Sequence, residues 1–334
     1  MKNLIDVRVD KRTELIGVLL LNSNYITKYS DLIGVCNNKE YRDEILSYFS
    51  KFKKEKIFKL LNTIIDKYYF NYDAPIFLIL QLNEDFTYDS LPDYPFRERL
   101  GSDKLILDFL SEVPKFVEKT KFLEFFDNHK TFYQAGITQI QKLIKKYKII
   151  EFMKQFYKLE LSHVKFIINL MHFATMVNYG TNHNNEFVCN CCLRSSKNGK
   201  INFIDSIDNT LTLYVHEFSH SLVNPLTHKY NDIKLEYFND IKESMQKQNY
   251  WHIEAIISEH IIRAIEIIYM KQESKIPNNL KCAENYLEFN KTIGFKYIEN
   301  CVTSLENYIN NIENYKNFEE YFSQILKDIK NAKI

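Results

Sequence analysis

The chain has 334 residues, and 44 lysines and arginines against 43 aspartates and glutamates give a formal net charge of +1. This balance gives no reason to expect nucleic acid or another polyanion as a partner. Hydrophobic residues make up 45% of the chain, which excludes an intrinsically disordered protein. The 7 glycines and 6 prolines are too few for a fold of many short strands and turns. We therefore predict a mainly α protein with a small β-sheet (α+β).

No targeting or membrane segment is evident. The first ten residues alternate charged and apolar side chains and lack the apolar stretch of a signal peptide. The longest apolar runs, Leu15–Leu21 and Ala74–Leu80, are far shorter than the roughly 20 residues that span a bilayer. The six cysteines do not suffice for a disulfide framework in a chain of this length. We therefore predict a cytoplasmic protein without a membrane partner, and the sequence leaves its oligomeric state open.

The first half of the chain has helical periodicity, and we assign residues 1–160 to a helical N-terminal lobe. Asp73–Pro75 predicts the start of one helix, because proline is tolerated in the first turn. Loops are predicted at Pro92–Pro95 and at Gly101–Asp103. Chains longer than roughly 250–300 residues tend to divide into two cores, which favours a second lobe.

The pattern changes near residue 162, and we assign residues 161–334 to this second lobe. Three short runs have the composition of strands: His163–Met171, Phe187–Leu193 and Ile201–Ile204. The sequence Asn198-Gly199 favours a tight hairpin before the last of them. Helices are predicted over residues 209–223 and 250–271, and the remainder of the chain is also expected to be helical.

Residues His216-Glu217-Phe218-Ser219-His220 form an HExxH motif. Positions i and i+4 lie on one face of a helix, so both imidazoles can bind the same metal ion. Glu217 can then take a proton from a water at the open position of the metal as that water attacks a carbonyl. The motif therefore predicts a metal site with a neighbouring general base.

The residues around the motif support a helical setting. Asp208 and Asn209 are suitable N-caps, and Asn224-Pro225 is expected to end the helix. Four apolar residues repeat at helical spacing: Leu211, Val215, Phe218 and Leu222. A chance occurrence of HExxH would usually lack these N-caps, the helix end and the apolar repeat.

The third protein ligand decides the class of the site. Val223 and Leu226 stand where a metzincin has glycine and histidine, which excludes that class. His228 lies beyond Pro225 and is expected at the surface or behind the ligands. The remaining candidate for the third ligand is a glutamate from the predicted helix 250–271.

Three glutamates of that helix are candidates: Glu254, Glu259 and Glu266. Glu254 points about 140° away from Glu259 on a helix of 3.6 residues per turn, so the two cannot face one ion. Glu259 and Glu266 both border the apolar stripe, and burial alone does not separate them. Arg263, one turn after Glu259, could restrain its carboxylate or bind a substrate carboxylate; a surface ion pair is the alternative.

At these residues the sequence resembles the gluzincins, zincin metallopeptidases whose third zinc ligand is a glutamate. Three segments look like uncharacterised bacterial domain families of that type: HEFSHSLVNP (216–225), SEHIIRA (258–264) and VDKRTELIGVLLLNS (9–23). The resemblance implies one Zn²⁺ per chain, held by His216, His220 and Glu259, with Glu217 as general base. It also implies a zincin-like core whose small sheet has its edge strand beside the cleft. Thermolysin-like members carry a further tyrosine or histidine that steadies the oxyanion, and Tyr179, Tyr250 and His252 are candidates.

Three cysteines lie close together in one predicted strand: Cys189, Cys191 and Cys192. With His183 they could bind a second metal ion if the chain turned sharply. A strand, however, places Cys189 and Cys191 on one face and Cys192 on the other, and a free cysteine packs as a small apolar residue. We expect packing rather than a second metal site.

Together these features predict zinc-dependent hydrolysis of peptide bonds, with a peptide or protein as substrate. The substrate is expected to lie extended along strand 187–193 as an added strand at the sheet edge. The alternatives are a zincin-like binding or regulatory module without catalysis, and a structural zinc site. The structural site is disfavoured because two histidines and one glutamate leave a coordination position open.

Overall fold

A computed structural model describes residues 5–29, 39–89, 97–161, 163–169, 178–183, 186–192, 195–197, 200–202, 207–230 and 238–331. In these ranges the protein is mainly helical with one small mixed sheet, which confirms the predicted fold class. The loop predicted at Pro92–Pro95 lies outside the described residues. None of the helices within these ranges is long and apolar enough to cross a membrane.

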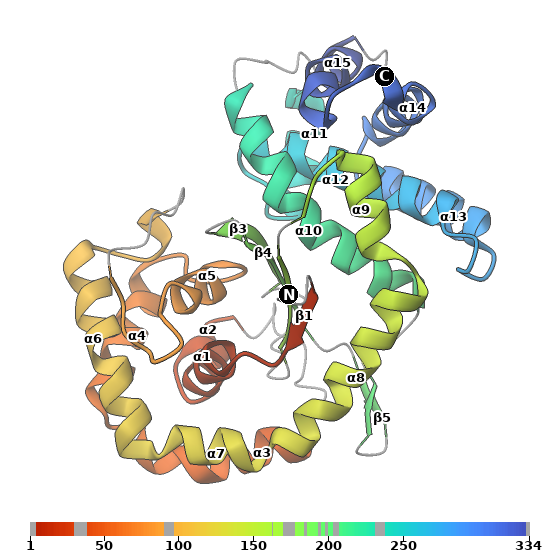
Figure 1. Ribbon diagram of the computed structural model, residues 1–334. Helices are drawn as coiled ribbons and strands as arrows, with labels where there is room; N and C mark the ends of the chain where they lie inside the picture. Colours follow the sequence, from red (N-terminus) through yellow and green to blue (C-terminus); the bar gives the residue numbers. More distant parts are fainter. Residues whose placement is uncertain are drawn as a thin grey trace.

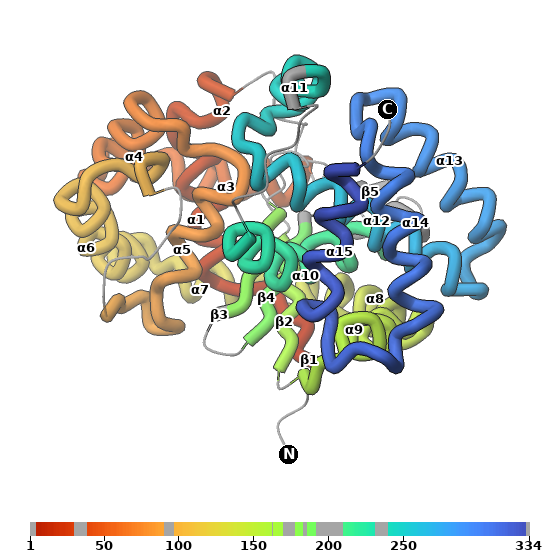
Figure 2. The backbone as a smooth tube through the Cα atoms, turned by 90° about the horizontal axis from the view of Figure 1, so that it is seen from above, coloured from red at the N-terminus to blue at the C-terminus, as the bar shows by residue number. Residues whose placement is uncertain are grey.

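The central sheet has the strand order β1-β2-β4-β3 (Figures 1 and 2). Its strands are β1 (Ile5–Arg8), β2 (Val164–Asn169), β3 (Tyr179–His183) and β4 (Glu186–Cys192). The strands β1, β2 and β4 are parallel, and β3 runs antiparallel to β4. β2 and β4 coincide with two predicted strands to within a few residues.

The position of β4 corrects one prediction. Because β4 lies between β2 and β3, its backbone is already paired on both sides and cannot accept a substrate as an added strand. The sheet edge on that side is β3, whose sequence Tyr-Gly-Thr-Asn-His has no apolar alternation that would identify a strand. A smaller antiparallel pair, β5 (Ser195–Lys197) and β6 (Lys200–Asn202), flanks the predicted hairpin turn.

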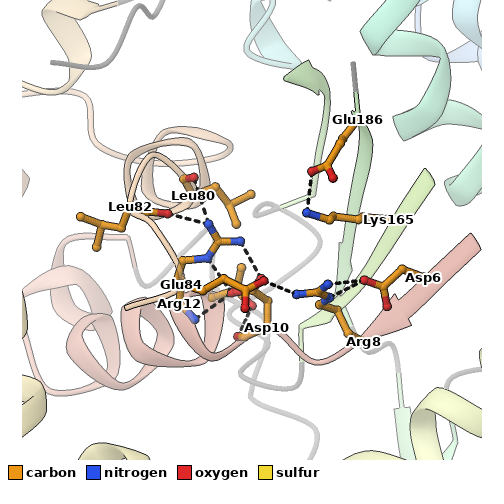
Figure 3. A network of polar contacts seen from close by, with 10 residues as sticks. Asp6, Arg8, Asp10, Arg12, Leu80, Leu82, Glu84, Lys165 and Glu186 are labelled. Atoms are coloured by element: carbon orange, nitrogen blue, oxygen red, sulfur yellow. Dashed lines mark hydrogen bonds and ion pairs between the residues drawn. The ribbon is translucent and has the colours of Figure 1, made fainter. Parts of the chain in front are cut away.

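The other edge strand, β1, comes from the segment that was assigned to the helical lobe, and a polar network joins it to that lobe (Figure 3). The Asp10 carboxylate accepts a hydrogen bond from the Arg12 amide at 2.9 Å and caps helix α1 (Lys11–Leu21). Arg12 also donates to the Leu82 carbonyl at 2.6 Å, and Arg8 pairs with Glu84 at 2.7 Å. These contacts fix β1 and α1 against the segment that follows α5 (Ala74–Leu80).

Helices of the first part of the chain gather on one side of the sheet (Figures 1 and 2). Besides α1 and α5 they are α2 (Tyr25–Lys28), α3 (Lys39–Phe49), α4 (Lys56–Lys67), α6 (Asp103–Thr120) and α7 (Phe122–Asn128), with short 3-10 turns at Ser50–Phe52 and Arg97–Arg99. Pro75 lies in the first turn of α5, and Ser102 caps α6, both where the sequence predicted a boundary.

The remaining helices lie on the other side of the sheet or next to it (Figure 2). They are α8 (Lys130–Lys146), α9 (Ile149–Tyr157), α10 (Ile207–Lys229), α11 (Phe238–Lys247), α12 (Ile253–Gln272), α13 (Asn279–Thr292), α14 (Ile298–Asn310) and α15 (Phe318–Lys330), with a 3-10 turn at Ile312–Asn314. Although α9 precedes residue 160, its aromatic side chains pack against helices of the second half of the chain. The ring centroids of Phe152 and Tyr269 are 5.0 Å apart, and those of Tyr157 and Phe318 are 5.1 Å apart.

Helix α10 is longer than predicted at both ends. It begins at Ile207, so Asp208 and Asn209 lie in its first turn and not at its cap, and it continues through Pro225 to Lys229. Pro225 is exposed, where the loss of one helical hydrogen bond can be compensated by water. Thr227, two residues later, is buried and accepts a hydrogen bond from Ser258 of α12 at 3.0 Å. Packing against α12 therefore outweighs the local tendency of proline to end the helix.

Candidate metal centre

Packing of α10 between the sheet and α12 determines which of its faces carries the motif. Phe218 is fully buried and stacks on Phe187 of β4, with ring centroids 4.9 Å apart and planes within 11° of each other. Leu211 and Val215 are buried on the same helix, as predicted. With these side chains held in the core, His216 and His220 are left on a face of α10 that meets Glu259 of α12.

Three side-chain atoms converge at this junction. His216 Nε2 lies 3.0 Å from His220 Nε2. Glu259 Oε1 lies 3.7 Å from His216 Nε2 and 3.5 Å from His220 Nε2. In tetrahedral coordination, ligand atoms about 2.1 Å from an ion are about 3.4 Å from one another, so the three measured separations fit one bound ion. Two imidazoles and a carboxylate are also ligand types that zinc prefers.

Burial and neighbouring charges shift the pKa values of the three converging residues. Burial by itself lowers the pKa of His216, but the carboxylates of Glu259 and Glu266 overcome this effect and raise that pKa well above its usual value. Burial and the charge of His216 lower the pKa of His220. Burial opposes ionisation of Glu259, yet His216 and Arg263 hold its pKa well below its usual range. Two carboxylates therefore face His216, and their negative charge favours a cation at this position.

Glu217 lies beside these ligand atoms. Its carboxylate belongs with His216 and His220 to a group whose possible ligand atoms lie within 4.8 Å of one another. The residue is buried, and burial together with the negative charges of Glu259 and Glu266 raises its pKa to about 8, although His216 acts in the opposite direction. Glu217 directly follows His216 in the chain and lies on the same helix as both histidines.

The second ring nitrogen of each histidine also has a partner. His216 Nδ1 lies 3.3 Å from Glu266 Oε1, and His220 Nδ1 lies 3.2 Å from Asn224 Oδ1. Partners of this kind fix the tautomer and orientation of a ligating imidazole and leave Nε2 directed at the metal. Glu266 therefore contacts the side of His216 that points away from Glu259. The spacing from His220 to Asn224, one helical turn, was a signal for this second contact that the sequence interpretation missed.

Arg263 lies behind Glu259 and is engaged on several sides. Its Nε is 3.3 Å from Glu259 Oε2, a distance that makes an ion pair, although neither atom has hydrogen-bond geometry. Its Nη2 donates to Tyr250 Oη at 3.4 Å, and its guanidinium lies 4.4 Å from the ring centroid of Phe295. Glu259 is buried and Arg263 keeps 17% of its side chain exposed, unlike the surface i, i+4 pair that the sequence left open. These contacts favour a role in restraining Glu259 over binding a substrate carboxylate.

The other nominated residues lie at different places. Tyr250 contacts both Arg263 and Glu259 through its hydroxyl, and burial raises its pKa. Tyr179 begins β3 with its ring centroid 6.0 Å from that of Phe77, and burial raises its pKa as well. His252 is exposed at the start of α12. Glu254 pairs with the exposed His228 at 3.2 Å, away from the site.

Gly180 of β3 lies directly against the motif helix. A Cβ atom built on Gly180 would lie 1.5 Å from the Glu217 carbonyl oxygen, much closer than two such atoms can approach. Only glycine therefore allows the edge strand to contact α10 at the residue proposed as the base. No sequence pattern identified this requirement.

We expect Gly180→Ala to lower the free energy of unfolding by about 3 kcal/mol, because β3 and α10 must separate to admit the methyl group. The measurement is urea unfolding followed by circular dichroism. Thr181→Ala, one residue along β3, is the control and should cost about 1 kcal/mol or less. Equal unfolding midpoints for the two variants would contradict the close approach.

Two cysteines of β4 pack in the core. Cys189 and Cys191 are both buried and unbridged, and they pair across the sheet with Phe166 and Ile168. The side chains of Cys192 and His183 lie outside the described residues. Among the side chains that are described, His216, Glu217 and His220 form a group of possible ligands with the spacing of a metal site, and neither Cys189 nor Cys191 belongs to it.

Replacing Cys189, Cys191 and Cys192 together with alanine should lower stability by about 1 kcal/mol per buried sulfur and leave one zinc per chain. Metal content by inductively coupled plasma mass spectrometry, with thermal unfolding alongside, checks both expectations. Two zinc ions in the wild-type protein and one in the variant would reveal a second metal site.

Comparison with known proteins gives a family but no activity. A family model described as a domain of unknown function (DUF4932) matches residues 5–328. No curated protein and no solved structure gives a significant match.

Proposed function

The chain belongs to the DUF4932 family, and from the geometry of its metal centre we propose that it is a zinc-dependent hydrolase of peptide bonds. The observation that carries the proposal is the convergence of His216, His220 and Glu259 beside the buried carboxylate of Glu217. A zinc site that serves stability alone has four protein ligands, whereas these three residues leave one coordination position open beside Glu217.

The three converging residues would hold the ion. Bound there, zinc would polarise the substrate carbonyl and acidify a water molecule. Glu217 would accept the proton of the attacking water on its carboxylate and later deliver it to the leaving amine.

A peptide is the substrate that the neighbouring sheet favours. Within the described part of the chain, the edge of β3 opposite β4 has no strand partner, and β3 lies against α10 at Glu217. An extended peptide could pair with such an edge through its backbone, with the bond to be cleaved near the base. This arrangement replaces β4 by β3 as the expected binding strand.

The test is incubation of the zinc-loaded protein with a peptide library, followed by mass spectrometry of the products, with and without a chelator. We expect cleavage with zinc, loss of cleavage with the chelator and recovery when zinc is returned. A protein that binds one zinc and binds peptides but leaves every peptide intact would instead be a non-catalytic binding module.

A further inference from the structure

Helix α13 contributes polar side chains to the region behind the metal centre. Tyr286 and Asn290 lie one turn apart on this helix, and both contact Arg263 of α12. Arg263 Nη1 donates to Tyr286 Oη at 3.3 Å and to Asn290 Oδ1 at 3.0 Å. Asn290 is fully buried, and its amide also donates to the Tyr286 carbonyl at 2.7 Å. No motif in the sequence marked either residue.

The Tyr286 hydroxyl lies between a cation and an anion. While it accepts from Arg263, it donates to Glu266 Oε2 at 2.5 Å. The other oxygen of Glu266 faces His216 Nδ1 at 3.3 Å, and Arg263 Nε faces Glu259 Oε2 at 3.3 Å. The Tyr286 hydroxyl thereby contacts two residues that each face a proposed ligand. Glu266 faces His216 of α10, and Arg263 faces Glu259 of α12.

We propose that Tyr286 is a positioning residue that orients His216 and Glu259 together for metal binding. The inference rests on the proposed metal site, though not on hydrolysis. The charges of the buried Glu266 and the part-buried Arg263 need hydrogen-bond partners to keep one conformation, because a charge withdrawn from water is costly when it is unpaired. The Tyr286 hydroxyl serves both residues, because it can donate its proton to Glu266 and accept a hydrogen bond from Arg263.

Removing this hydroxyl should loosen both ligands at once. Glu266 would lose the partner that fixes its second oxygen, and its contact with His216 Nδ1 would no longer be held in one orientation. Arg263 would keep Asn290, Tyr250 and Phe295 but lose one of the contacts that align it beside Glu259. Loss of a residue that hydrogen-bonds to a metal ligand typically lowers metal affinity about 10–100-fold. Because Tyr286 supports two ligands, we expect the upper part of that range.

The test compares Tyr286→Phe with Tyr269→Phe. Tyr269 is also buried, and its hydroxyl donates to the Tyr147 carbonyl at 2.8 Å, outside this network. Zinc affinity is measured by competition with a chromophoric chelator, and the Co²⁺-substituted proteins are compared by visible absorption. We expect Tyr286→Phe to lower zinc affinity about 10–100-fold and to change the Co²⁺ spectrum, and Tyr269→Phe to change neither while losing similar stability.

Wild-type affinity and an unchanged Co²⁺ spectrum in Tyr286→Phe would overturn the inference. If that variant does not fold, Glu266→Gln tests the route to His216 with the shape of the side chain preserved, and unchanged zinc affinity there would also overturn it. The proposed function can fail separately. A wild-type protein that binds zinc but cleaves no peptide would refute hydrolysis and leave the role of Tyr286 intact, whereas a protein that binds no zinc would refute both.

Discussion

Glu217→Gln should abolish peptide hydrolysis and leave zinc binding unchanged. Glutamine has nearly the same shape as glutamate, but its amide cannot accept the proton of an attacking water. General base catalysis typically contributes about 10²–10⁴-fold, so we expect kcat/KM to fall by at least that factor. The measurements are kcat/KM on a peptide identified from the library and zinc content by mass spectrometry.

Glu254→Gln is the matched control for this change. Glu254 is on α12 and pairs with His228 on the exposed side of the molecule, so the variant should keep both zinc and activity. Cleavage by Glu217→Gln at the wild-type rate would contradict the role of base. Loss of zinc from Glu217→Gln would show that Glu217, which lies within 4.8 Å of the histidine nitrogens, acts as a ligand instead.

Glu259→Ala should lose most of the bound zinc and all measurable activity. Its carboxylate is the one that faces both imidazole Nε2 atoms, whereas Glu266 faces His216 Nδ1 alone. Loss of a ligand should cost more affinity than the roughly 10–100-fold expected for Glu266→Ala, which removes an outer partner. Zinc affinities measured by chelator competition should therefore fall in the order wild type, Glu266→Ala, Glu259→Ala.

Glu254→Ala again provides the reference, with wild-type affinity expected. A greater loss in Glu266→Ala than in Glu259→Ala would identify Glu266 as the ligand. Because Glu259 also neutralises the part-buried Arg263, the unfolding curve of each variant is needed alongside its affinity. A folded Glu259→Ala protein with wild-type zinc affinity would contradict the proposed ligand set.

The sequence predicted the elements that have strong local signals. The helical spacing of Leu211, Val215 and Phe218 identified the buried face of α10, and this face fixes where the two histidines point. The choice between Glu259 and Glu266 was harder, because both border one apolar stripe of α12. Burial periodicity gives the face of a helix but not its axial position against a neighbour, and that position depends on the packing between α10 and α12.

Features imposed by tertiary contacts were not visible in the sequence. The strand β3 is polar and short, and it forms because it pairs with β4 and because Gly180 allows contact with α10. Pro225 follows a local rule for ending helices, yet packing of Thr227 on α12 continues the helix beyond it. Tyr286 contacts Glu266 and Arg263 from a third helix, α13, whose position no short motif specifies.

The central claim is that His216, His220 and Glu259 bind one zinc ion beside Glu217. Anomalous diffraction at the zinc absorption edge, from crystals of the zinc-loaded protein, tests it directly. We predict a single strong peak about 2.1 Å from both Nε2 atoms and from Glu259 Oε1. A peak bound by the cysteine sulfurs of β4, or a zinc-saturated crystal with no peak between the two imidazoles, would contradict the claim.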